Sequence, residues 1–433
     1  MTRLALHWQI LIAILLAGIA GWAVNYAGGG DASAPAIFGV SYLSGFQYVG
    51  ALFLNALKMI IVPLILSSII VGMAGIGSSG NLGALGGRTL LFYVATTVAA
   101  ILVGLALINL IGPGYVNGEP AGSLLALEAP TDEIAARVAG RGAGDVADLF
   151  LRMIPENVVM AAARGEMLGI IFFALLFGYF MTKLEHNLAE PMYKFWDGVF
   201  NVMMRMTEWI MLFAPIGVFG LVAAVVAETG FSAAGPLATF ALATLAGLII
   251  HAGITLPLFL KVFGRVSPYK IFPAMAPAML TAFSTASSSA TLPVTMDCVE
   301  KNAGVSNKIS SFVLPLGATV NMNGTALYEC AAAIFLAQAY GLDLTFGTQF
   351  TIVAIALMTS IGVAGVPAAS LVAIAIILTA IGLPVEAIGV LMVFDRVLDM
   401  VRTSVNIFGD SCAAVIIARM DGEKTNLAPE PAR

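Results

Sequence analysis

The sequence predicts an all-α polytopic membrane protein, and three observations lead to this fold class. Of the 433 residues, 60% are hydrophobic and 10% are charged, whereas soluble domains carry about 25% charged residues. Apolar runs that reach the roughly 20 residues of a membrane-spanning helix recur along the chain. Two further apolar runs are broken by serine, glycine and proline. We therefore expect eight transmembrane helices and two opposed re-entrant helical hairpins.

The runs of spanning length are separated by short polar loops. The first is longer than the apolar core of a signal peptide, so we expect it to remain as a helix with a cytoplasmic start. Residues 114–165 form a Gly/Ala-rich connector that we expect to include an amphipathic surface helix. The expected spans are residues 5–26, 46–75, 87–113, 166–184, 195–227, 235–263, 306–338 and 384–418, and the broken runs are residues 271–300 and 347–381.

Composition excludes several functional classes. The net charge of −5 provides no basic field, so nucleic acid is not an expected partner. The three cysteines lie in apolar runs, which argues against a disulfide framework. Three histidines without zinc-ligand spacing make a zinc site unexpected.

The distribution of lysine and arginine decides the topology of the two broken runs. Residues 261–270 and 301–308 flank the first broken run and carry Lys or Arg, which marks both as cytoplasmic. Residues 339–347 and 381–388 flank the second and carry neither, which marks both as external. Each broken run is then a re-entrant hairpin, one from each face. Transporters built on inverted repeats, with a binding site at the membrane midplane, have this pattern.

The first hairpin turns at residues 284–291, which are rich in serine and threonine, and the second turns at residues 360–370, where glycine and proline lie between Ser360 and Ser370. Irregular backbone at membrane depth needs polar surroundings, and helix N-termini that meet there suit a carboxylate. Ordinary kinked spans are the alternative interpretation. The hydroxyl groups that we take as substrate candidates at these turns are Ser287, Ser288, Ser289 and Ser370.

The last span carries a stripe of polar side chains on one helical face of about 100°. Arg402 provides a two-pronged donor for a carboxylate, and Asp399 can accept an ammonium group, so the pair suits an acidic amino acid. Because the carboxylates outnumber the arginines, including Arg396, the stripe also invites a cation. A purely structural ion-pair network is the alternative. The stripe comprises Asp395, Asp399, Arg402, Thr403, Asn406 and Asp410.

The preceding span, residues 314–329, is expected to be a broken helix. Gly317, Asn321, Asn323 and Gly324 weaken the helix and free backbone carbonyls. Amide, carbonyl and carboxylate oxygens are ligands for hard cations such as sodium. Asn321, Thr325 and Glu329 are spaced i, i+4 and i+8, so we expect them to line one helical face. Buried Glu329 is a candidate for carrying a proton, the alternative being a structural hydrogen-bonded carboxyl group.

These segments resemble the dicarboxylate/amino acid:cation symporter family, which includes archaeal aspartate transporters and excitatory amino acid transporters. The resemblance covers most of the chain and is carried by several motifs in order: Ser287-Ser-Ser-Ala-Thr-Leu-Pro293, Leu314-Pro-Leu-Gly-Ala-Thr319, Asn321-Met-Asn-Gly-Thr325, Ala364-Gly-Val-Pro367 and Asp399…Arg402-Thr403…Asn406…Asp410.

The resemblance implies an inverted-repeat elevator transporter that assembles as a homotrimer. It implies scaffold helices within residues 1–75 and 166–227, with residues 114–165 as a connector. The mobile transport domain would comprise residues 87–113 (helix 3) and residues 235–422. Helix 6, hairpin 1 (near residues 268–300), helix 7, hairpin 2 (near residues 347–381) and helix 8 would lie within this second stretch.

The resemblance also implies roles for individual residues. The implied substrate contacts are Ser288, Thr325, Val366, Asp399, Arg402, Thr403 and Asn406. One sodium ion would lie among Gly317, Asn321, Asn406 and Asp410. A second would use carbonyls of Thr319, Ser360 and Gly362, and a third would involve Tyr93, Thr96, Thr97, Asn321 and Asn323.

Three positions depart from the family pattern. Asn323 stands where the family usually has Asp, which removes a charged ligand from the third sodium site. The family usually places an arginine at one of two positions that are Ala286 and Met400 in this chain, and Arg396 is the candidate substitute. Glu329 matches the eukaryotic branch, where this carboxyl group is linked to proton and potassium coupling.

The sequence therefore predicts a sodium-coupled symporter of aspartate or glutamate in the cell inner membrane, surrounded by lipid, with no organic cofactor and no enzymatic activity. Carriers of neutral amino acids or C4-dicarboxylates are the alternative within this class. From other classes, Gly77-Ser-Ser-Gly80 with His251 suggests an intramembrane protease, and the polar stripe could line a channel.

Overall fold

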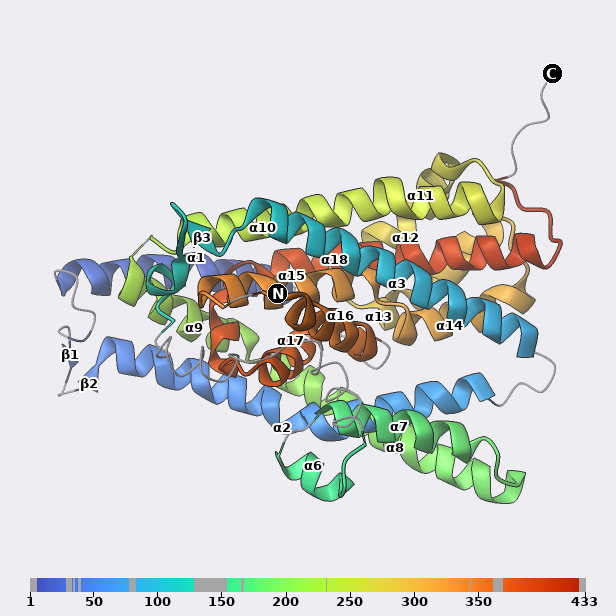
Figure 1. Ribbon diagram of the computed structural model, residues 1–433, viewed down its shortest axis with the longest axis horizontal. Helices are drawn as coiled ribbons and strands as arrows, with labels where there is room; N and C mark the ends of the chain where they lie inside the picture. The colour runs from blue at the N-terminus through green and yellow to red at the C-terminus, as the bar shows by residue number, and fades with distance from the viewer. Residues whose placement is uncertain are drawn as a thin grey trace, which may run out of the picture.

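The computed structural model is an elongated bundle of helices (Figure 1). The structure describes residues 6–28, 33, 36–37, 40–77, 83–127, 154–164, 167–230, 232–342, 344–360 and 369–427. Its α-helices are α1 Leu6–Ala27, α2 Tyr42–Gly77, α3 Gly83–Ile111, α6 Val158–Arg164, α7 Met167–Met181, α8 His186–Met211, α9 Ala214–Thr229, α10 Ala234–Ile250, α11 Leu256–Phe259, α12 Ile271–Thr285, α13 Ser288–Asp297, α14 Asn307–Val320, α15 Asn323–Ala339, α16 Phe346–Ser360, α17 Ala369–Ile381 and α18 Ile388–Met420. Two short antiparallel hairpins pair β1 Ala36–Ile37 with β2 Val40–Ser41, and β3 Tyr115–Val116 with β4 Glu119–Pro120.

The helices pack as two groups. In the peripheral group, α2 contacts α7, α8 and α9, and α1 lies along α9. In the central group, α18 contacts α10, α12, α14 and α15, while α3 packs on α15 and α10. The two groups meet where α18 contacts α9 and α1, where α2 contacts α14 and α17, and where α7 contacts α16. In Figure 1 the long helices of both groups run along the length of the bundle.

α18 is the most enclosed of the long apolar helices that the structure describes. In an apolar 18-residue stretch of this helix 94% of the residues are buried, whereas the corresponding share is 28% for α1, 44% for α3 and 39% for Ala234–Gly264. Every residue of α15 is also buried. Because charged side chains in an apolar medium need polar partners, these two interior helices are where such side chains can be accommodated.

The outer surface of the bundle is apolar, as expected for contact with lipid. Four described helices are long and apolar enough to span a membrane: Trp8–Ala27, Leu85–Ile111, Ala234–Gly264 and Val385–Met420. The bent pair α8–α9, with an angle of 56°, would be a fifth. The full set of eight spans stays a prediction. Large exposed apolar side chains on the outer helices include Leu15, Ile19, Leu91, Leu110, Leu242, Ile249, Ile254 and Leu258.

The two broken runs each form a pair of short helices that pack together. α12 and α13 are joined by Ala286 and Ser287, and α16 packs on α17. The turn between α16 and α17, residues 361–368, lies outside the described residues. In the connector, residues 128–153 likewise lie outside them, and α6 is a short helix near its end.

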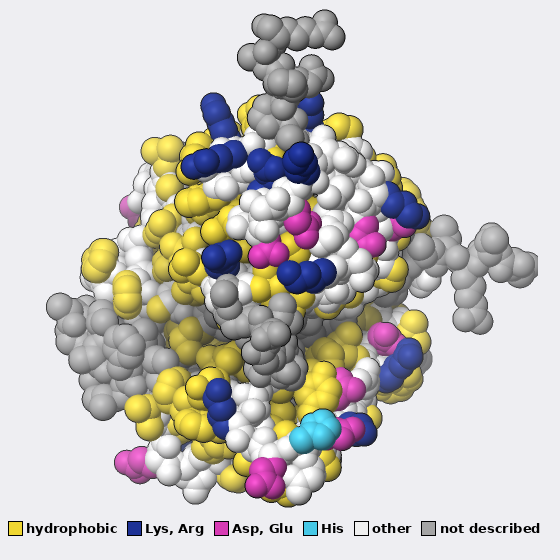
Figure 2. Space-filling model, turned by 90° about the vertical axis from the view of Figure 1, so that its right-hand side faces the viewer, with side chains coloured by type: hydrophobic (Ala, Val, Ile, Leu, Met, Phe, Trp, Pro, Cys, Tyr) yellow, Lys and Arg dark blue, Asp and Glu magenta, His cyan; other side chains and the backbone are white. Residues whose placement is uncertain are grey.

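Basic side chains gather at one end of the bundle. Figure 2 shows this end, with Lys and Arg side chains spread over it among some acidic ones. In Figure 1 the junction of α7 with α8 and the last turn of α18 lie at the same end. An excess of Lys and Arg at one end is the asymmetry typical of proteins that span a membrane.

Backbone contact between α2 and α9 depends on Gly220. A Cβ at this position would lie 2.8 Å from the Phe46 carbonyl oxygen and 2.9 Å from the Gly50 nitrogen. Because backbone atoms cannot rotate away, we expect Gly220→Ala to lower the free energy of unfolding by about 1–3 kcal/mol. Thermal unfolding of the detergent-purified protein measures this.

Gly45→Ala is the matched control, because a Cβ at Gly45 in α2 meets no atom within 4 Å. It should leave the unfolding midpoint unchanged or raise it slightly through helix propensity. Equal midpoints for the two variants would contradict the close α2–α9 packing.

Candidate functional site

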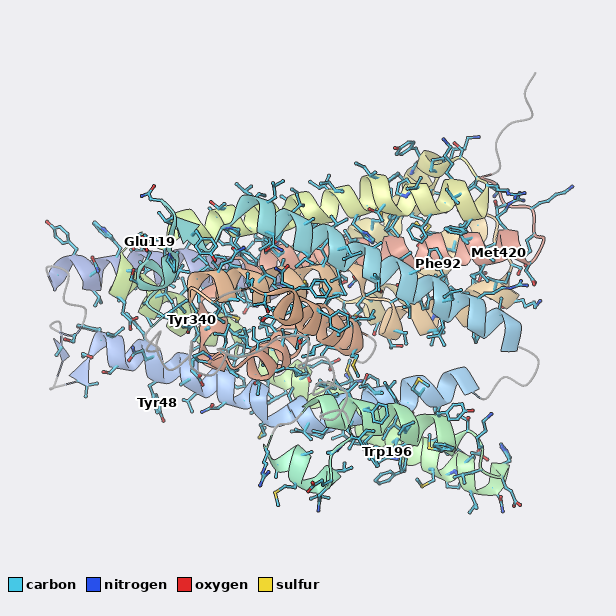
Figure 3. The ribbon with its side chains drawn as sticks, viewed as in Figure 1. Tyr48, Phe92, Glu119, Trp196, Tyr340 and Met420 are labelled. Atoms are coloured by element: carbon cyan, nitrogen blue, oxygen red, sulfur yellow. The ribbon has the colours of Figure 1, made fainter. Side chains whose placement is uncertain are left out.

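The site is built around the break between α14 and α15. α14 ends at Val320, Asn321 and Met322 leave helical geometry, and Asn323 begins α15. The prediction that Asn321, Thr325 and Glu329 share one helical face is therefore wrong for Asn321, because the helix is interrupted there. Figure 3 gives the frame: Tyr340, just beyond α15, lies toward one end of the bundle, and Phe92 and Met420 lie toward the other.

Asn406 of α18 caps the new helix. Its Oδ1 accepts hydrogen bonds from the N–H groups of Gly324 (2.8 Å) and Thr325 (3.3 Å), and its Nδ2 donates to Thr325 Oγ1 (3.0 Å). Helix N-termini leave N–H groups that need such acceptors. A Cβ at Gly324 would lie 2.8 Å from the Arg402 carbonyl oxygen, so glycine permits this close approach of α15 to α18.

A buried cluster of oxygen atoms surrounds Asp410. Asn321 Nδ2 donates to Asp410 Oδ1 (2.9 Å), and Thr96 Oγ1 lies 3.5 Å from Asn321 Oδ1. A Cβ at Gly317 would lie 2.5 Å from Asp410 Oδ1 and 2.8 Å from the Tyr93 hydroxyl, which donates to the Val313 carbonyl oxygen. The structure thus brings together five predicted ion ligands from α3, α14 and α18. Because the other four residues of the cluster are neutral and the Asp410 carboxylate is buried, the cluster favours a cation.

Asn323 lies in a neutral set of contacts. Thr97 Oγ1 donates to Asn323 Oδ1 (3.0 Å), and Asn323 Nδ2 lies 3.4 Å from His251 Nε2. His251 is fully buried in a π-helical turn at the end of α10. The position where the family usually carries a charge is therefore filled here by an amide with polar neighbours.

Four charged side chains of α18 form a second cluster. Arg402 Nη2 lies 2.9 Å from Asp399 Oδ1 and 3.2 Å from Asp395 Oδ1. Arg396 Nη1 lies 3.4 Å from Asp399 Oδ2. All four side chains are buried, and the guanidinium carbon of Arg402 lies 3.8 Å from the centroid of the Tyr328 ring. Such stacking and ion pairing stabilise an arginine in apolar surroundings.

Arg402 still has donors to offer. Within the described part of the chain, its Nε and Nη1 atoms are buried and have no hydrogen-bond partner. These two donors lie on different edges of the guanidinium group, because each edge is shared with Nη2, which faces the two aspartates. Each of them can form a charge-assisted hydrogen bond to a carboxylate oxygen. The arrangement can therefore hold an anionic group at Arg402 close to Asp399.

The serines of the first hairpin have different environments. Ser287 caps α13 through a hydrogen bond from the Ala290 N–H (3.2 Å), Ser288 is buried, and Ser289 is exposed. Ala286 before them has a φ of 49°, a conformation uncommon for residues other than glycine. Of the three serines, only Ser288 has a side chain buried inside the protein.

The second hairpin meets Glu329. Thr359 Oγ1 of α16 donates to Glu329 Oε2 (3.0 Å), while the Glu329 Oε1 atom is buried without a partner among described residues. Ser360 and Ser370 are buried, Thr319 is half-buried, and Thr403 donates to the Asp399 carbonyl oxygen (2.8 Å). Gly362 and Val366 lie outside the described residues.

Tyr328, Thr359 and the pairing of His251 with Asn323 were not anticipated from the sequence. Tyr328 and Thr359 come from α15 and α16, so their approach to α18 and to Glu329 depends on tertiary packing. The one available signal was the position of Tyr328 directly before Glu329 in a helix with no exposed face.

Comparison with known proteins identifies the family. A profile of the sodium:dicarboxylate symporter family matches residues 6–420. The chain belongs to this family. The resemblance deduced from the sequence motifs is thereby confirmed. The family consists of transporters. Together with the long apolar helices of this chain, membership of the family identifies the chain as a membrane protein.

Relatives in the sodium:dicarboxylate symporter family differ in what their names state. The proton/sodium-glutamate symport protein of Geobacillus stearothermophilus is 34% identical over 426 residues, covering 98% of this chain and 96% of the relative. The proton/glutamate-aspartate symporter of Escherichia coli K12 is 33% identical, with coverage of 97% and 93%. Human neutral amino acid transporter B(0) is 34% identical, with coverage of 98% and 81%. The family thus supports cation-coupled amino acid symport.

Removal of Arg402 should destabilise the fold. Arg402→Leu would leave Asp395 and Asp399 buried without their shared partner, and breaking such a buried pair costs about 3 kcal/mol or more. Thermal unfolding of the purified protein should show a clearly lower midpoint. The control Arg205→Leu removes an exposed pair with Glu208, which contributes little. A midpoint for Arg402→Leu equal to that of the control would contradict this description of the cluster.

Proposed function

We propose that the chain is a secondary active symporter that takes up acidic amino acids, aspartate or glutamate, together with sodium. The observation that carries the proposal is that fully buried Arg402, beside Asp399, has two donors, Nε and Nη1, without a partner among the described residues. Asp399 would bind the α-ammonium group and Arg402 the side-chain carboxylate. A neutral amino acid would leave these donors of Arg402 without an anionic partner in a dry site, which is costly.

Supporting residues complete the proposed substrate site. Thr325 and Asn406 join α15 to α18 beside Arg402, and Thr403 lies on the same helix. Buried Ser288 would supply a hydroxyl group from the first hairpin. Ser287, Ser289, Ser370 and Val366 remain candidates from the two hairpin tips.

For the ions, the donor set around Asp410 supports a sodium site. Gly317, Asn321 and Asp410 are in contact, with Tyr93 and Thr96 close by, and Asn406 contributes from the adjoining helix. The second set, carbonyls of Thr319, Ser360 and Gly362, stays a proposal from the resemblance. At the third, Thr97 and Asn323 are in contact, but Asn323 lacks the charge of a strong ligand. We therefore propose fewer than three sodium ions per substrate.

Glu329 is the proposed proton carrier. It is fully buried, one of its oxygens accepts a hydrogen bond from Thr359, and the other has no partner within the described residues. A neutral carboxyl group could donate from that second oxygen without leaving a buried charge unpaired. The names of bacterial relatives, proton/sodium-glutamate symport protein and proton/glutamate-aspartate symporter, support proton involvement.

For the mechanism, we propose that the central group moves as a transport domain against the peripheral group as a scaffold. Separate packing within each group supports this division. The proposed assembly is a homotrimer, with eight spans and two re-entrant hairpins, in a cell inner membrane. The apolar outer surface and the bacterial relatives support the membrane placement.

Carriers of neutral amino acids are the second candidate, because relatives named neutral amino acid transporter B(0) are 34–36% identical to this chain. Buried Arg402 favours the acidic substrate over this alternative.

Exchange of Arg402 tests the proposed substrate class. In proteoliposomes with sodium supplied outside, the wild type should accumulate labelled L-aspartate against the concentration gradient of L-aspartate. A channel would only let L-aspartate flow down that gradient. Arg402→Gln should lower L-aspartate uptake by about a hundredfold or more, because the carboxylate loses its two donors. Uptake of L-glutamine by the same variant serves as the folding control and should appear or increase. Unchanged L-aspartate uptake in Arg402→Gln would contradict the acidic-substrate assignment.

Crowding the Asp410 cluster tests the sodium site. A Cβ added by Gly317→Ala would reach Asp410 Oδ1 and the Tyr93 hydroxyl, so the sodium concentration for half-maximal L-aspartate uptake should rise about tenfold. Gly235→Ala is the control, since a Cβ there meets no atom within 4 Å. An identical sodium dependence in both variants would exclude this cluster as an ion site.

A further inference from the structure

Arg396 is a buried charged residue to which the proposed mechanism assigns no task. It lies on α18 three residues before Asp399, and its exposure is 6%. Its Nη1 faces Asp399 Oδ2 at 3.4 Å, whereas Arg402 Nη2 faces Asp399 Oδ1 at 2.9 Å. The two oxygens of Asp399 are therefore each directed at a different arginine.

A small cavity lies between Arg396 and the peripheral group. Its volume is about 20 Å³, which holds about one water molecule. On its far side the cavity has an apolar wall from the peripheral group. The charged residues that line the cavity, Asp395, Arg396 and Asp399, all belong to α18. The wall residues are Ile10, Phe53, Met211, Ala214 and Val218.

The charges of this stretch balance without a substrate. Asp395 and Asp399 carry two negative charges, and Arg396 and Arg402 carry two positive ones, all buried. An amino acid bound at Asp399 would bring a third positive group to the same carboxylates. A dicarboxylate without an amino group would bring none, so the two arginines would then face Asp399 without a competing ammonium group.

We propose that Arg396 is a positioning residue that serves as the internal counter-ion of Asp399 and thereby sets the preference between dicarboxylates with and without an amino group. When the ligand has an ammonium group, Arg396 competes with it for Asp399. When the ligand has none, Arg396 supplies the buried Asp399 carboxylate with positive charge in place of the ammonium group. This inference rests on the proposed function, in which Asp399 holds the ammonium group and Arg402 the carboxylate.

The test compares two ligands that differ in the amino group. Binding of L-aspartate and of succinate to the purified protein is measured in sodium by competition against labelled L-aspartate. In Arg396→Met the ratio of the two dissociation constants should shift by about tenfold toward L-aspartate, because the competitor is lost for one ligand and the counter-ion for the other. Arg396→Lys retains a cation and should restore a ratio close to that of the wild type.

Two further variants keep the comparison decisive. Arg396→Gln has a polar neutral side chain and replaces Arg396→Met if that variant does not fold. Arg205→Gln removes an exposed arginine that pairs with Glu208 on α8, and it should leave the ratio unchanged. A merely structural role of Arg396 would weaken both ligands equally and leave their ratio as in the wild type.

The outcomes separate the two proposals. If the wild type binds L-aspartate and the ratio is unchanged in the neutral Arg396 variants, Arg396 is not the counter-ion that sets the preference, and the proposed function stands. A wild type that binds L-aspartate but excludes succinate even at high concentration would also overturn the role of Arg396. If the wild type does not bind L-aspartate, the proposed function itself fails.

Discussion

Charge compensation inside an apolar interior is the constraint on which this structure depends. α18 places Asp395, Arg396, Asp399 and Arg402 within eight consecutive positions, all of them buried. Ionised groups in such surroundings are tolerated when opposite charges and aromatic faces are close by. The surrounding helices supply an aromatic face at Arg402 through Tyr328, and the helix itself supplies the opposite charges. At Asp410 the neighbours are polar but neutral, and this imbalance is the reason for which we propose a cation there.

A related constraint, the pairing of buried backbone groups, applies to the break between α14 and α15. A continuous helix has used its N–H and C=O groups internally, so it has none to offer a ligand. The break at Asn321 and Met322 exposes such groups beside α18. The N–H groups at the start of α15 lie inside the protein, where the Asn406 side chain accepts hydrogen bonds from them. Irregular backbone within the protein is thereby stabilised by protein contacts rather than by water.

Sequence reasoning recovered what is local and missed what is tertiary. The stripe from Asp395 to Asp410 follows from helical periodicity, because α18 is one continuous helix. The oxygens near Asp410 followed from family motifs around Gly317 and Asn321. The stacking of Tyr328 on Arg402 depends on how α15 and α18 are rotated, which periodicity does not specify. The shared face of Asn321 with Thr325 was wrong, because glycine and asparagine indicate where a helix weakens but not where it stops.

The cap supplied by Asn406 has a consequence for the biogenesis of the protein. The first N–H groups of α15 find their acceptor on a residue 82 positions later in the chain, on the last helix that the structure describes. While the ribosome is still producing that helix, α15 has already been synthesised, and the N–H groups of its first turn do not yet have Asn406 as their hydrogen-bond acceptor. The centre of the protein therefore matures late, and a nascent chain that ends before α18 holds the parts of the pocket without the residue that joins them.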